Sequence, residues 1–474
     1  MAEDEKLGSR VVVWCLGVIC NNRKYLALLL CLTRIIVWYI SYYCFVFLVK
    51  LVWRVEMFIR NSEKLIKELL HDFRILYLTG PRQAGKTTLA RKIAQDLGMQ
   101  YVTLDEQAAF SSAQNDPQGF IDSLAKRPVV LDEFQYVPEL VRAIKLVSDR
   151  LSPQDRGRFL LTGSADIFKS AKTQEALPGH MARVELYPLS VTEKQASRFN
   201  LIDFLLAEDL SLPETSLVLS REMIAQALID GGYPEMQDRG SRAKQTWYKS
   251  YLQGRLFKDF ESIYAAKGDY HTKLMSLIPY LAGLSGNLLK YASVANDLGQ
   301  NDKVVKSYIE ALEWMFIVKR IHPYVKNRAK RQTIGMPKIH MIDTGLSCHL
   351  LGLKKKEQLL NSIYYGGMLE NFVVMECFKH LAWSEETMEI YHFRDKRKHE
   401  VDIVLEQEDN RLIAIEVKGA STIRSCDFNG LQKFAEIVGD QLKFGLVFYT
   451  GSRLLPFGGD DKPYYAVPLS LLWS

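Results

Sequence analysis

Between residues 57 and about 195, short apolar runs alternate with longer segments in which apolar side chains recur every three or four positions. The short runs lie near residues 75–79, 101–104, 128–132 and 158–163. Apolar runs of this length that alternate with helical patterns are typical of buried parallel strands joined by helices. The pattern therefore predicts an α/β domain with a parallel sheet over residues 57–198.

The pattern changes after this domain. Residues 199–220, which include LIDFLLAEDLSLPETSLVLS, are interpreted as a linker, and a mostly helical pattern follows to about residue 320. Within it, residues 291–299 and 301–312 predict two helices separated by a turn at Gly299, as in helix-turn-helix units. A β wing is expected to begin at residues 318–323. We predict a helical, winged-helix domain over residues 221–355.

Basic side chains gather around this predicted unit, at Lys303, Lys306, Lys319, Arg320, Lys326, Arg328, Lys330 and Arg331. Such a face can contact the phosphates of DNA. The alternative is a solvated helix pair that serves only for packing, since charge runs are often solvated faces. The sequence leaves both interpretations open.

Residues 400–406 (EVDIVLE) and 412–418 (LIAIEVK) alternate between apolar and polar positions and predict a β-hairpin. Burying Val401, Ile403 and Leu405 with Ile413, Ile415 and Val417 pairs positions whose numbers sum to 818, because a one-residue slip would expose one set. This register predicts that Asp402 lies directly opposite Glu416, with Lys418 on the same face.

Opposed carboxylates repel each other unless a cation lies between them. A divalent metal held by Asp402 and Glu416, with Lys418 beside it, would suit phosphodiester hydrolysis, in which the metal activates water. The alternative is a surface hairpin held by an ion pair between Asp402 and Lys418.

The first 56 residues contain apolar runs at 11–20, 25–32 and 35–49. No run reaches the roughly 18 to 20 residues of a membrane span unless Lys50 extends its side chain to the interface, in which case residues 35–53 would serve. The acidic start and the lack of a small-residue cleavage site argue against a signal peptide. Alternatively, translation begins at Met57 and residues 1–56 are a mis-assigned upstream segment.

Composition narrows the class further. The length of 474 residues predicts about three domains. The 48% hydrophobic and 24% charged residues are ordinary for globular proteins, and the net charge of +6 is too small to argue for nucleic acid by itself. Seven cysteines without a C-x-x-C pair give no sign of a disulfide framework or a zinc site. We predict a cytoplasmic protein, or one anchored in a membrane through residues 35–53.

Residues 80–87 read GPRQAGKT and match the phosphate-loop pattern G-x-x-x-x-G-K-[ST] between a predicted strand and a helix. Glycines let backbone N–H groups close around the β- and γ-phosphates at a helix N-terminus, where the helix dipole favours anions. We expect Lys86 to neutralise phosphate oxygens and Thr87 to bind Mg²⁺. The predicted nucleotide-contacting residues are Gly80, Pro81, Arg82, Gln83, Ala84, Gly85, Lys86, Thr87, Thr88, Asp132 and Ser164.

Two acids end the apolar run PVVLDE at residues 128–133. Asp132 suits the Mg²⁺ shell and Glu133 suits orientation of the attacking water. The run at 158–163 ends before Ser164, which is predicted to contact the γ-phosphate or the water. Because the carboxyl ends of parallel strands form the ligand-binding edge of such sheets, we expect Lys86, Asp132 and Ser164 to lie together.

From about residue 57 onward the chain resembles the prokaryotic AAA+ family ATPases that carry an uncharacterised C-terminal nuclease-like domain. The resemblance rests on several segments of the sequence: TGPRQAGKTTL, VVLDEFQYVPELVRAIK, LLTGS, LPGHMARVELYPLSVTE, PKIHMIDTGL, GGMLENFVVMECF, FRDKRKHEVDIVLE and IAIEVK. It implies an AAA+ core, a winged-helix middle and an α/β restriction-endonuclease-like domain of the PD-(D/E)XK type over residues 356–474. It also places Glu370, Asp402, Glu416 and Lys418 at catalytic positions, with Glu370, Asp402 and Glu416 as ligands of a second Mg²⁺ or of Mn²⁺.

One position departs from the family pattern. His180 stands where the family has an arginine after LPG, and Arg183 is the nearest arginine, which puts an arginine finger in doubt. The resemblance suggests a homo-oligomer. The leading hypothesis is an ATPase whose nucleotide state positions a DNA-facing winged helix and a nuclease-like domain. The alternatives are a regulatory ATP switch with an inert nuclease fold, and a membrane-tethered ATPase.

Overall fold

The computed structural model describes residues 58–152, 154–164, 181–207, 219–257, 260–261, 270–327, 331, 335–458 and 464–474. All elements below belong to the unit Ile59–Ser474. The predicted apolar segment 1–56, together with His180, Arg328 and Lys330, lies outside the described residues. Within the described ranges, no helix combines the length and the apolar character needed to cross a membrane.

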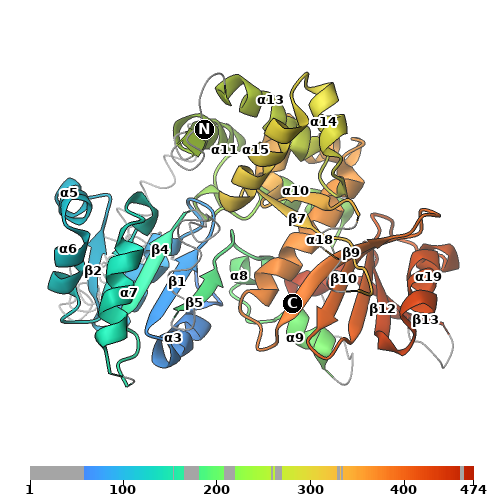
Figure 1. The fold of residues 1–474 in the computed structure, drawn as a ribbon. Coiled ribbons are helices and arrows are strands. Elements are labelled where there is room, and N and C mark those ends of the chain that lie inside the picture. Colours follow the sequence, from blue (N-terminus) through green and yellow to red (C-terminus); the bar gives the residue numbers. More distant parts are fainter. Residues whose placement is uncertain are drawn as a thin grey trace, which may run out of the picture. The chain divides into compact units, whose positions relative to one another are not determined.

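The first domain contains a five-stranded sheet with strand order β2-β3-β4-β1-β5, and every pair in it is parallel (Figure 1). The strands are β1 (Ile75–Thr79), β2 (Gln100–Thr103), β3 (Val129–Asp132), β4 (Phe159–Gly163) and β5 (Met181–Glu185). The four predicted strands are confirmed to within one residue at each end, and β5 adds an edge strand that the pattern did not indicate. The helices are α3 (Glu63–Asp72), α4 (Lys86–Leu97), α5 (Gln107–Asn115), α6 (Pro117–Leu124), α7 (Leu140–Arg150) and the 3-10 turn η1 (Phe134–Tyr136).

Strand β1 shows why a continuous apolar run was needed. Ile75 and Tyr77 pack in the core beneath α6 and α7, whereas Leu76 and Leu78 pack in the core beneath α3 and α4. Successive side chains of a strand point to opposite faces, so a strand covered by helices on both faces is apolar over most of its length.

The predicted linker is wrong for its first part, because residues 201–206 form helix α9 (Leu201–Leu206). Leu201, Ile202 and Leu205 are buried and belong to one hydrophobic core with α10 (Arg221–Asp230), α18 (Tyr365–Leu381) and strands of the C-terminal sheet. Residues 208–218 lie outside the described residues. The short α8 (Val191–Lys194) precedes α9 and begins with a capping box at Ser190.

The middle region is helical with a small antiparallel sheet of order β6-β8-β7. The two predicted helices are present as α14 (Tyr291–Asp297) and α15 (Asp302–Trp314), with Gly299 between them at φ +61°. The other elements are η3 (Pro234–Met236), α11 (Ser241–Ser250), η4 (Tyr251–Leu256), α13 (Tyr270–Gly283), β6 (Asn287–Leu288), β7 (Val318–Ile321), β8 (Lys338–Met341), α16 (Thr344–Leu350) and α17 (Lys356–Leu360).

The C-terminal region is a mixed six-stranded sheet with order β13-β14-β12-β11-β10-β9. Helix α18 packs in the core on one face and α19 packs in the core on the other. The elements that follow α18 are β9 (Met388–Arg394), β10 (Glu400–Gln407), β11 (Leu412–Val417), η6 (Ser425–Phe428), α19 (Asn429–Val438), η7 (Gly439–Gln441), β12 (Leu442–Tyr449), β13 (Leu455–Phe457), β14 (Tyr464–Pro468) and η8 (Leu469–Trp473).

The predicted hairpin register is confirmed, since β10 and β11 pair Ile403 with Ile415 and Leu405 with Ile413. The placement of Val401 is wrong. An irregularity in the pairing of β10 with β9 lies between Val401 and Val404, and Val401 packs on the α19 face while Ile403 packs on the α18 face. Because both faces of this sheet are buried, the alternation of apolar and polar residues could not show which face Val401 occupies.

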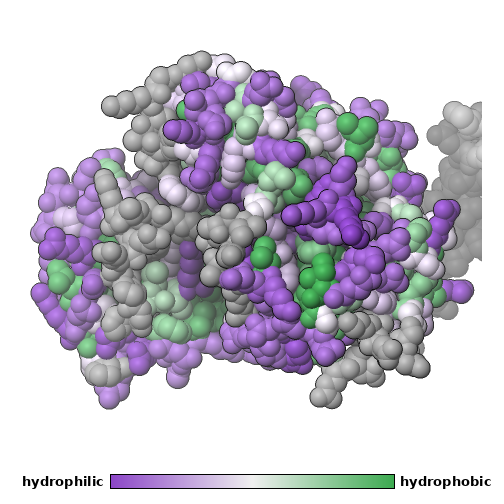
Figure 2. Space-filling view, turned by 45° about the vertical axis from the view of Figure 1, so that its right-hand side comes forward, coloured by the Kyte–Doolittle hydropathy of each residue, from purple (hydrophilic) through white to green (hydrophobic). Residues whose placement is uncertain are grey.

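On the face drawn in Figure 2, hydrophobic residues form separate groups among hydrophilic ones.

Candidate functional site

The phosphate-loop segment lies between the end of β1 and the start of α4, as its pattern predicts. Gly80 has φ +150° and Gly85, the N-cap of α4, has φ +99°. A Cβ at Gly80 would lie 2.1 Å from the carbonyl oxygen of Leu186. The first glycine is therefore required both by its backbone angle and by a close backbone neighbour.

Lys86 is buried and crosses the loop. Its Nζ donates to the carbonyl oxygens of Gly80 and Pro81, each at 2.8 Å. The ammonium thus lies against the loop backbone, where the phosphates of a bound nucleotide would also lie.

Asp132 ends β3 with only 2% of its surface exposed. Thr87 Oγ1 donates to both carboxylate oxygens at 3.1 Å, Tyr101 Oη donates at 2.6 Å, and Thr162 Oγ1 also donates to the carboxylate. Because Mg²⁺ takes oxygen ligands and is commonly held by one carboxylate, a hydroxyl, waters and substrate phosphates, the adjacent Thr87 and Asp132 oxygens fit this ion.

Glu133 and Ser164 are brought together by a residue that the sequence analysis did not single out. Gln135 Nε2 donates to Ser164 Oγ at 3.0 Å and also to the Glu133 carboxylate, while Gln135 Oε1 accepts from the Ser164 backbone N–H at 3.3 Å. Glu133 has φ +57°, a left-handed conformation that is costly for a side chain of this kind. The available sequence signal for Gln135 was its position two residues after Glu133. Thr162, which donates to Asp132, lies within the predicted strand 158–163.

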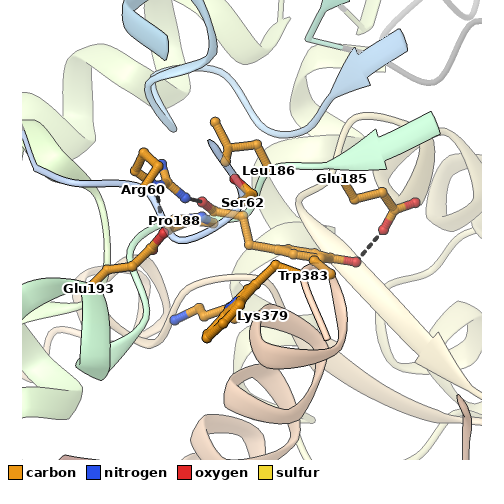
Figure 3. A pocket seen from close by; sticks show the side chains of 10 residues that line it. Arg60, Ser62, Glu185, Leu186, Pro188, Glu193, Lys379 and Trp383 are labelled. Atoms are coloured by element: carbon orange, nitrogen blue, oxygen red, sulfur yellow. Dashed lines mark hydrogen bonds and ion pairs between the residues drawn. The ribbon is translucent and has the colours of Figure 1, made fainter. Parts of the chain in front are cut away.

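A second residue that the sequence analysis did not single out, Arg60, contacts the phosphate loop. Arg60 is buried, and its guanidinium donates to the carbonyl oxygens of Ala84 at 2.6 Å and Tyr187 at 2.7 Å and pairs with Glu193 at 2.9 Å. Figure 3 shows Arg60 and Glu193 joined by this ion pair at a small pocket that Lys379 and Trp383 also line. No local pattern marks Arg60, because its partner Glu193 is 133 positions away.

The segment that contains Glu193 also contacts α18. The backbone N–H of Val191 donates to Glu376 Oε2 at 2.9 Å, and Lys379 Nζ donates to Leu189 O at 3.0 Å and to Glu376 Oε1 at 2.8 Å. Burial raises the pKa of the Glu376 carboxyl, but the charge of Lys379 and the neighbouring His380 outweigh it and lower the pKa to about 2. The Glu376 carboxyl is therefore ionised in the folded protein at neutral pH.

The second predicted site lies where α18, β10 and β11 meet. Lys338, the first residue of β8, places its Nζ 2.8 Å from Glu370, 2.7 Å from Glu400 and 3.0 Å from Asp402, and its side chain is 1% exposed. The predicted residues Glu370 and Asp402 are thus brought together through a lysine that the sequence analysis did not assign.

Glu416 and Lys418 form their own ion pair at 2.7 Å. Glu416 Oε2 is buried and has no hydrogen-bond partner among the described residues. The β10–β11 ladder ends at Ile403 and Ile415, and Asp402 Oδ2 accepts from the Val417 backbone N–H at 2.9 Å.

A divalent metal was expected among these carboxylates, and the residues as arranged do not fit one. The ammonium of Lys338 lies between Glu370 and Asp402, and among the described residues no group of His, Cys, Asp and Glu side chains is placed to hold a metal ion. The sequence-based expectation of a metal held by Glu370, Asp402 and Glu416 is therefore not supported. The pairing argument called for a cation, and two lysines supply it: Lys338 from β8 pairs with Asp402, and Lys418 pairs with Glu416.

Electrostatics follow the same arrangement. Burial lowers the pKa of the Lys338 ammonium, but Asp402, Glu370 and Glu400 outweigh it and hold the pKa above the usual value. Burial and the nearby Asp402 charge raise the pKa of the Glu370 and Glu416 carboxyls, while Lys338 and Lys418 oppose that rise.

Several side chains of the predicted basic face form ion pairs within the protein. Arg320 pairs with Glu313 at 2.6 Å, Arg331 pairs with the buried Glu406, and Lys319 lies 3.6 Å from Glu185. The exposed lysines that the structure describes in this group are Lys303, Lys306 and Lys326. Arg183, the arginine nearest to His180 in the sequence, pairs with Glu185 at 2.8 Å.

The parallel sheet, the phosphate loop and the acids at the end of β3 define a P-loop domain of the AAA class. Family models agree: residues 72–194 match an AAA domain, residues 221–357 match a domain of unknown function (DUF8612), and residues 365–472 match a domain of unknown function (DUF4143). The AAA core predicted from sequence is confirmed.

Two uncharacterised mycobacterial proteins resemble this chain over most of its length. Mb2031c of Mycobacterium bovis and Rv2008c of Mycobacterium tuberculosis are each 27% identical over 365 residues, covering 77% of this chain and 74% of the relative. Among solved structures, the Walker-type ATPase PABY2304 of Pyrococcus abyssi is similar, with 16% identity, a TM-score of 0.35 and coverage of 63% of this chain and 97% of that one.

Proposed function

We propose that this chain is an Mg²⁺-dependent ATPase that hydrolyses ATP at the phosphate loop. The observation that supports this most directly is the cluster at the carboxyl ends of β1, β3 and β4. There Lys86 contacts the loop backbone, Thr87 donates to Asp132, and Gln135 links Glu133 to Ser164. The choice of ATP follows from the AAA domain match.

The residues divide the work by their chemistry. Mg²⁺, when bound, would neutralise charge on the β- and γ-phosphates, and Thr87 and Asp132 would hold it. Lys86 would exchange its loop carbonyl partners for phosphate oxygens. Glu133 would accept a hydrogen bond from the attacking water, and Gln135 would hold the side chains of Glu133 and Ser164 in position relative to each other.

The test separates binding from turnover. Lys86→Ala is expected to lose tight ATP binding, whereas Glu133→Gln keeps binding and loses turnover, because it retains a similar shape without the carboxylate. Glu139→Gln is the matched control, since Glu139 is exposed in the loop that follows. Equal ATPase rates in wild type and Glu133→Gln would remove Glu133 from this role.

The proposed consequence of hydrolysis is a change at α18. Arg60 contacts both the phosphate loop, through Ala84, and Glu193, whose segment contacts α18. The measurement is hydrogen exchange of residues 365–381 with and without ATP, in wild type and Arg60→Met. An ATP-dependent change that is equal in both proteins would contradict the role of Arg60.

A second candidate concerns DNA. The order α13-β6-α14-α15-β7-β8 supports the proposed winged helix, and the order α18-β9-β10-β11-α19-β12 supports the proposed nuclease-like fold. Lys303 and Lys306 are exposed on α15. If they contact phosphates, replacing both by alanine should lower the salt slope of DNA binding by about 2; an unchanged slope would leave α15 a packing helix.

Among the functional alternatives, the arrangement of Lys338 favours a regulatory ATP switch whose nuclease-like fold is inert in the state described here. We expect no Asp402-dependent cleavage of plasmid or single-stranded DNA by wild type with Mg²⁺ or Mn²⁺. Cleavage that Asp402→Ala abolishes would contradict this. A homo-oligomer stays a prediction, and a concentration-dependent ATPase rate would test it.

A further inference from the structure

Lys338 has a complete set of partners. An ammonium group carries three N–H donors. Glu370 and Asp402 accept hydrogen bonds at 2.8 and 3.0 Å, and Glu400 forms an ion pair at 2.7 Å; these partners come from one helix and one strand of the C-terminal region. A buried charge is tolerated only when it is paired in this way, so the lysine and the cluster form one structural unit.

The backbone of Lys338 is equally constrained. It belongs to β8, the central strand of the small sheet, where it pairs with Leu288 of β6 and Ile321 of β7. The chain just after β7 in turn contacts β9, through a hydrogen bond from Tyr324 N to His392 O at 2.6 Å. The position of the ammonium is therefore set by the middle sheet, not by a flexible loop.

Every carboxylate in this cluster already has a cation. Besides the three held by Lys338, Glu400 accepts from Arg394 at 3.0 Å, and Glu416 pairs with Lys418 at 2.7 Å. Carboxylate oxygens placed around an ammonium at these distances are too far from its centre for Mg²⁺, which requires about 2.1 Å.

We propose that Lys338 is the resident cation of the carboxylate cluster, through which the middle region closes this position to divalent metal ions. The ion pairs of the cluster connect β8 to α18 and β10 without a metal ion. A divalent ion gains access only when the Lys338 side chain is removed or withdrawn. The proposal is independent of ATP hydrolysis.

The test is Mn²⁺ binding to the nucleotide-free full-length protein, counted by loss of the electron paramagnetic resonance signal of free Mn²⁺. Wild type and Asp402→Asn should bind the same number of ions. Lys338→Met should gain one ion per chain, and the double variant Lys338→Met/Asp402→Asn should lose it again. Lys418→Met is the matched control, because it removes a charge from the same cluster but leaves Lys338 in place, and it should gain none.

Lys338→Met leaves Glu370 and Asp402 without their cation, while Glu400 keeps Arg394, so its folding is followed by thermal unfolding with and without Mn²⁺. Stabilisation by Mn²⁺ in this variant, absent in wild type, is the expected result. Lys338→Met/Glu400→Gln relieves part of the repulsion if the single variant does not fold.

Three results would overturn the proposal. The first is a Mn²⁺ ion in wild type that Asp402→Asn loses. The second is a folded Lys338→Met, or a folded Lys338→Met/Glu400→Gln, that gains no ion. The third is an equal gain in Lys418→Met. If neither Lys338 variant folds even with Mn²⁺, the wild-type comparison decides, since equal counts in wild type and Asp402→Asn support the closed site.

Discussion

Glu376 allows a controlled measurement of what holds the AAA domain to α18, because the chain contains the same kind of ion pair twice. Glu376 and Lys379 lie three positions apart on α18, with N and O atoms 2.8 Å apart and 1% and 9% of their side chains exposed. Lys433 and Glu436 have the same spacing on α19 and a distance of 2.7 Å, but 46% and 64% of their side chains are exposed. The two pairs share spacing and distance but differ in burial, in the order of acid and base along the helix, and in the contact that Glu376 makes with the Val191 N–H.

The expected magnitude follows from the pKa of Glu376. The carboxyl has a pKa of about 2 in the folded protein against an ordinary value of 4.5, a difference that corresponds to about 3 kcal/mol at neutral pH. The folded pKa lies below the unfolded one, so this stability is present above pH 4.5 and is lost as the pH falls towards 2. Glu376→Gln keeps an acceptor for the Val191 N–H and removes only the charge.

We therefore expect Glu376→Gln to destabilise the α8–α18 contact by about 3 kcal/mol at pH 7 and by much less near pH 3. Glu436→Gln should cost about 0–1 kcal/mol at pH 7. Because a chain with several domains need not unfold in a single step, the assay is hydrogen exchange of residues 186–194 and 365–381. The reasoning is refuted if both variants increase exchange equally, or if the effect of Glu376→Gln does not shrink at low pH.

Three further changes have defined outcomes. Gly80→Ala should abolish ATP binding, measured with a fluorescent ATP analogue, because its Cβ would lie 2.1 Å from Leu186 O; unchanged affinity would contradict the loop geometry. Gln135→Ala should lower the ATPase kcat by about tenfold or more without weakening ATP binding, and a weaker affinity at constant kcat would argue against a positioning role. Arg331→Met should destabilise the C-terminal region by about 3–5 kcal/mol, measured by hydrogen exchange of residues 400–407, because it removes the guanidinium that pairs with the buried Glu406; a change below about 1 kcal/mol would show the pair to be dispensable.

Much of the fold could be read from the sequence, because the deciding signals are local. Strands β1 to β4 were predicted from their apolar runs, the phosphate loop from its glycines, and the β10–β11 register from alternation over a few residues. Each of these features depends on neighbours that are close along the chain or on one short hairpin. The match of residues 72–194 to an AAA domain agrees with the AAA core that the family resemblance implied.

The bridge at the nucleotide site needed more than local information. Gln135 joins Glu133 to Ser164 only because η1 and the end of β4 meet at the edge of the sheet. Arg60 reaches the phosphate loop and Glu193 across the fold, and no periodicity reports such a contact.

The alternating hairpin pattern is enough to predict that cations accompany the carboxylates of β10 and β11, since opposed negative charges are unstable without them. Which cations these are depends on the packing: the ammonium of Lys338 pairs with Asp402, and that of Lys418 pairs with Glu416. Lys338 is 32 positions before Glu370 and 64 before Asp402. Its position depends on how the middle sheet packs against α18 and β10, and packing between distant segments leaves no periodic trace in the sequence.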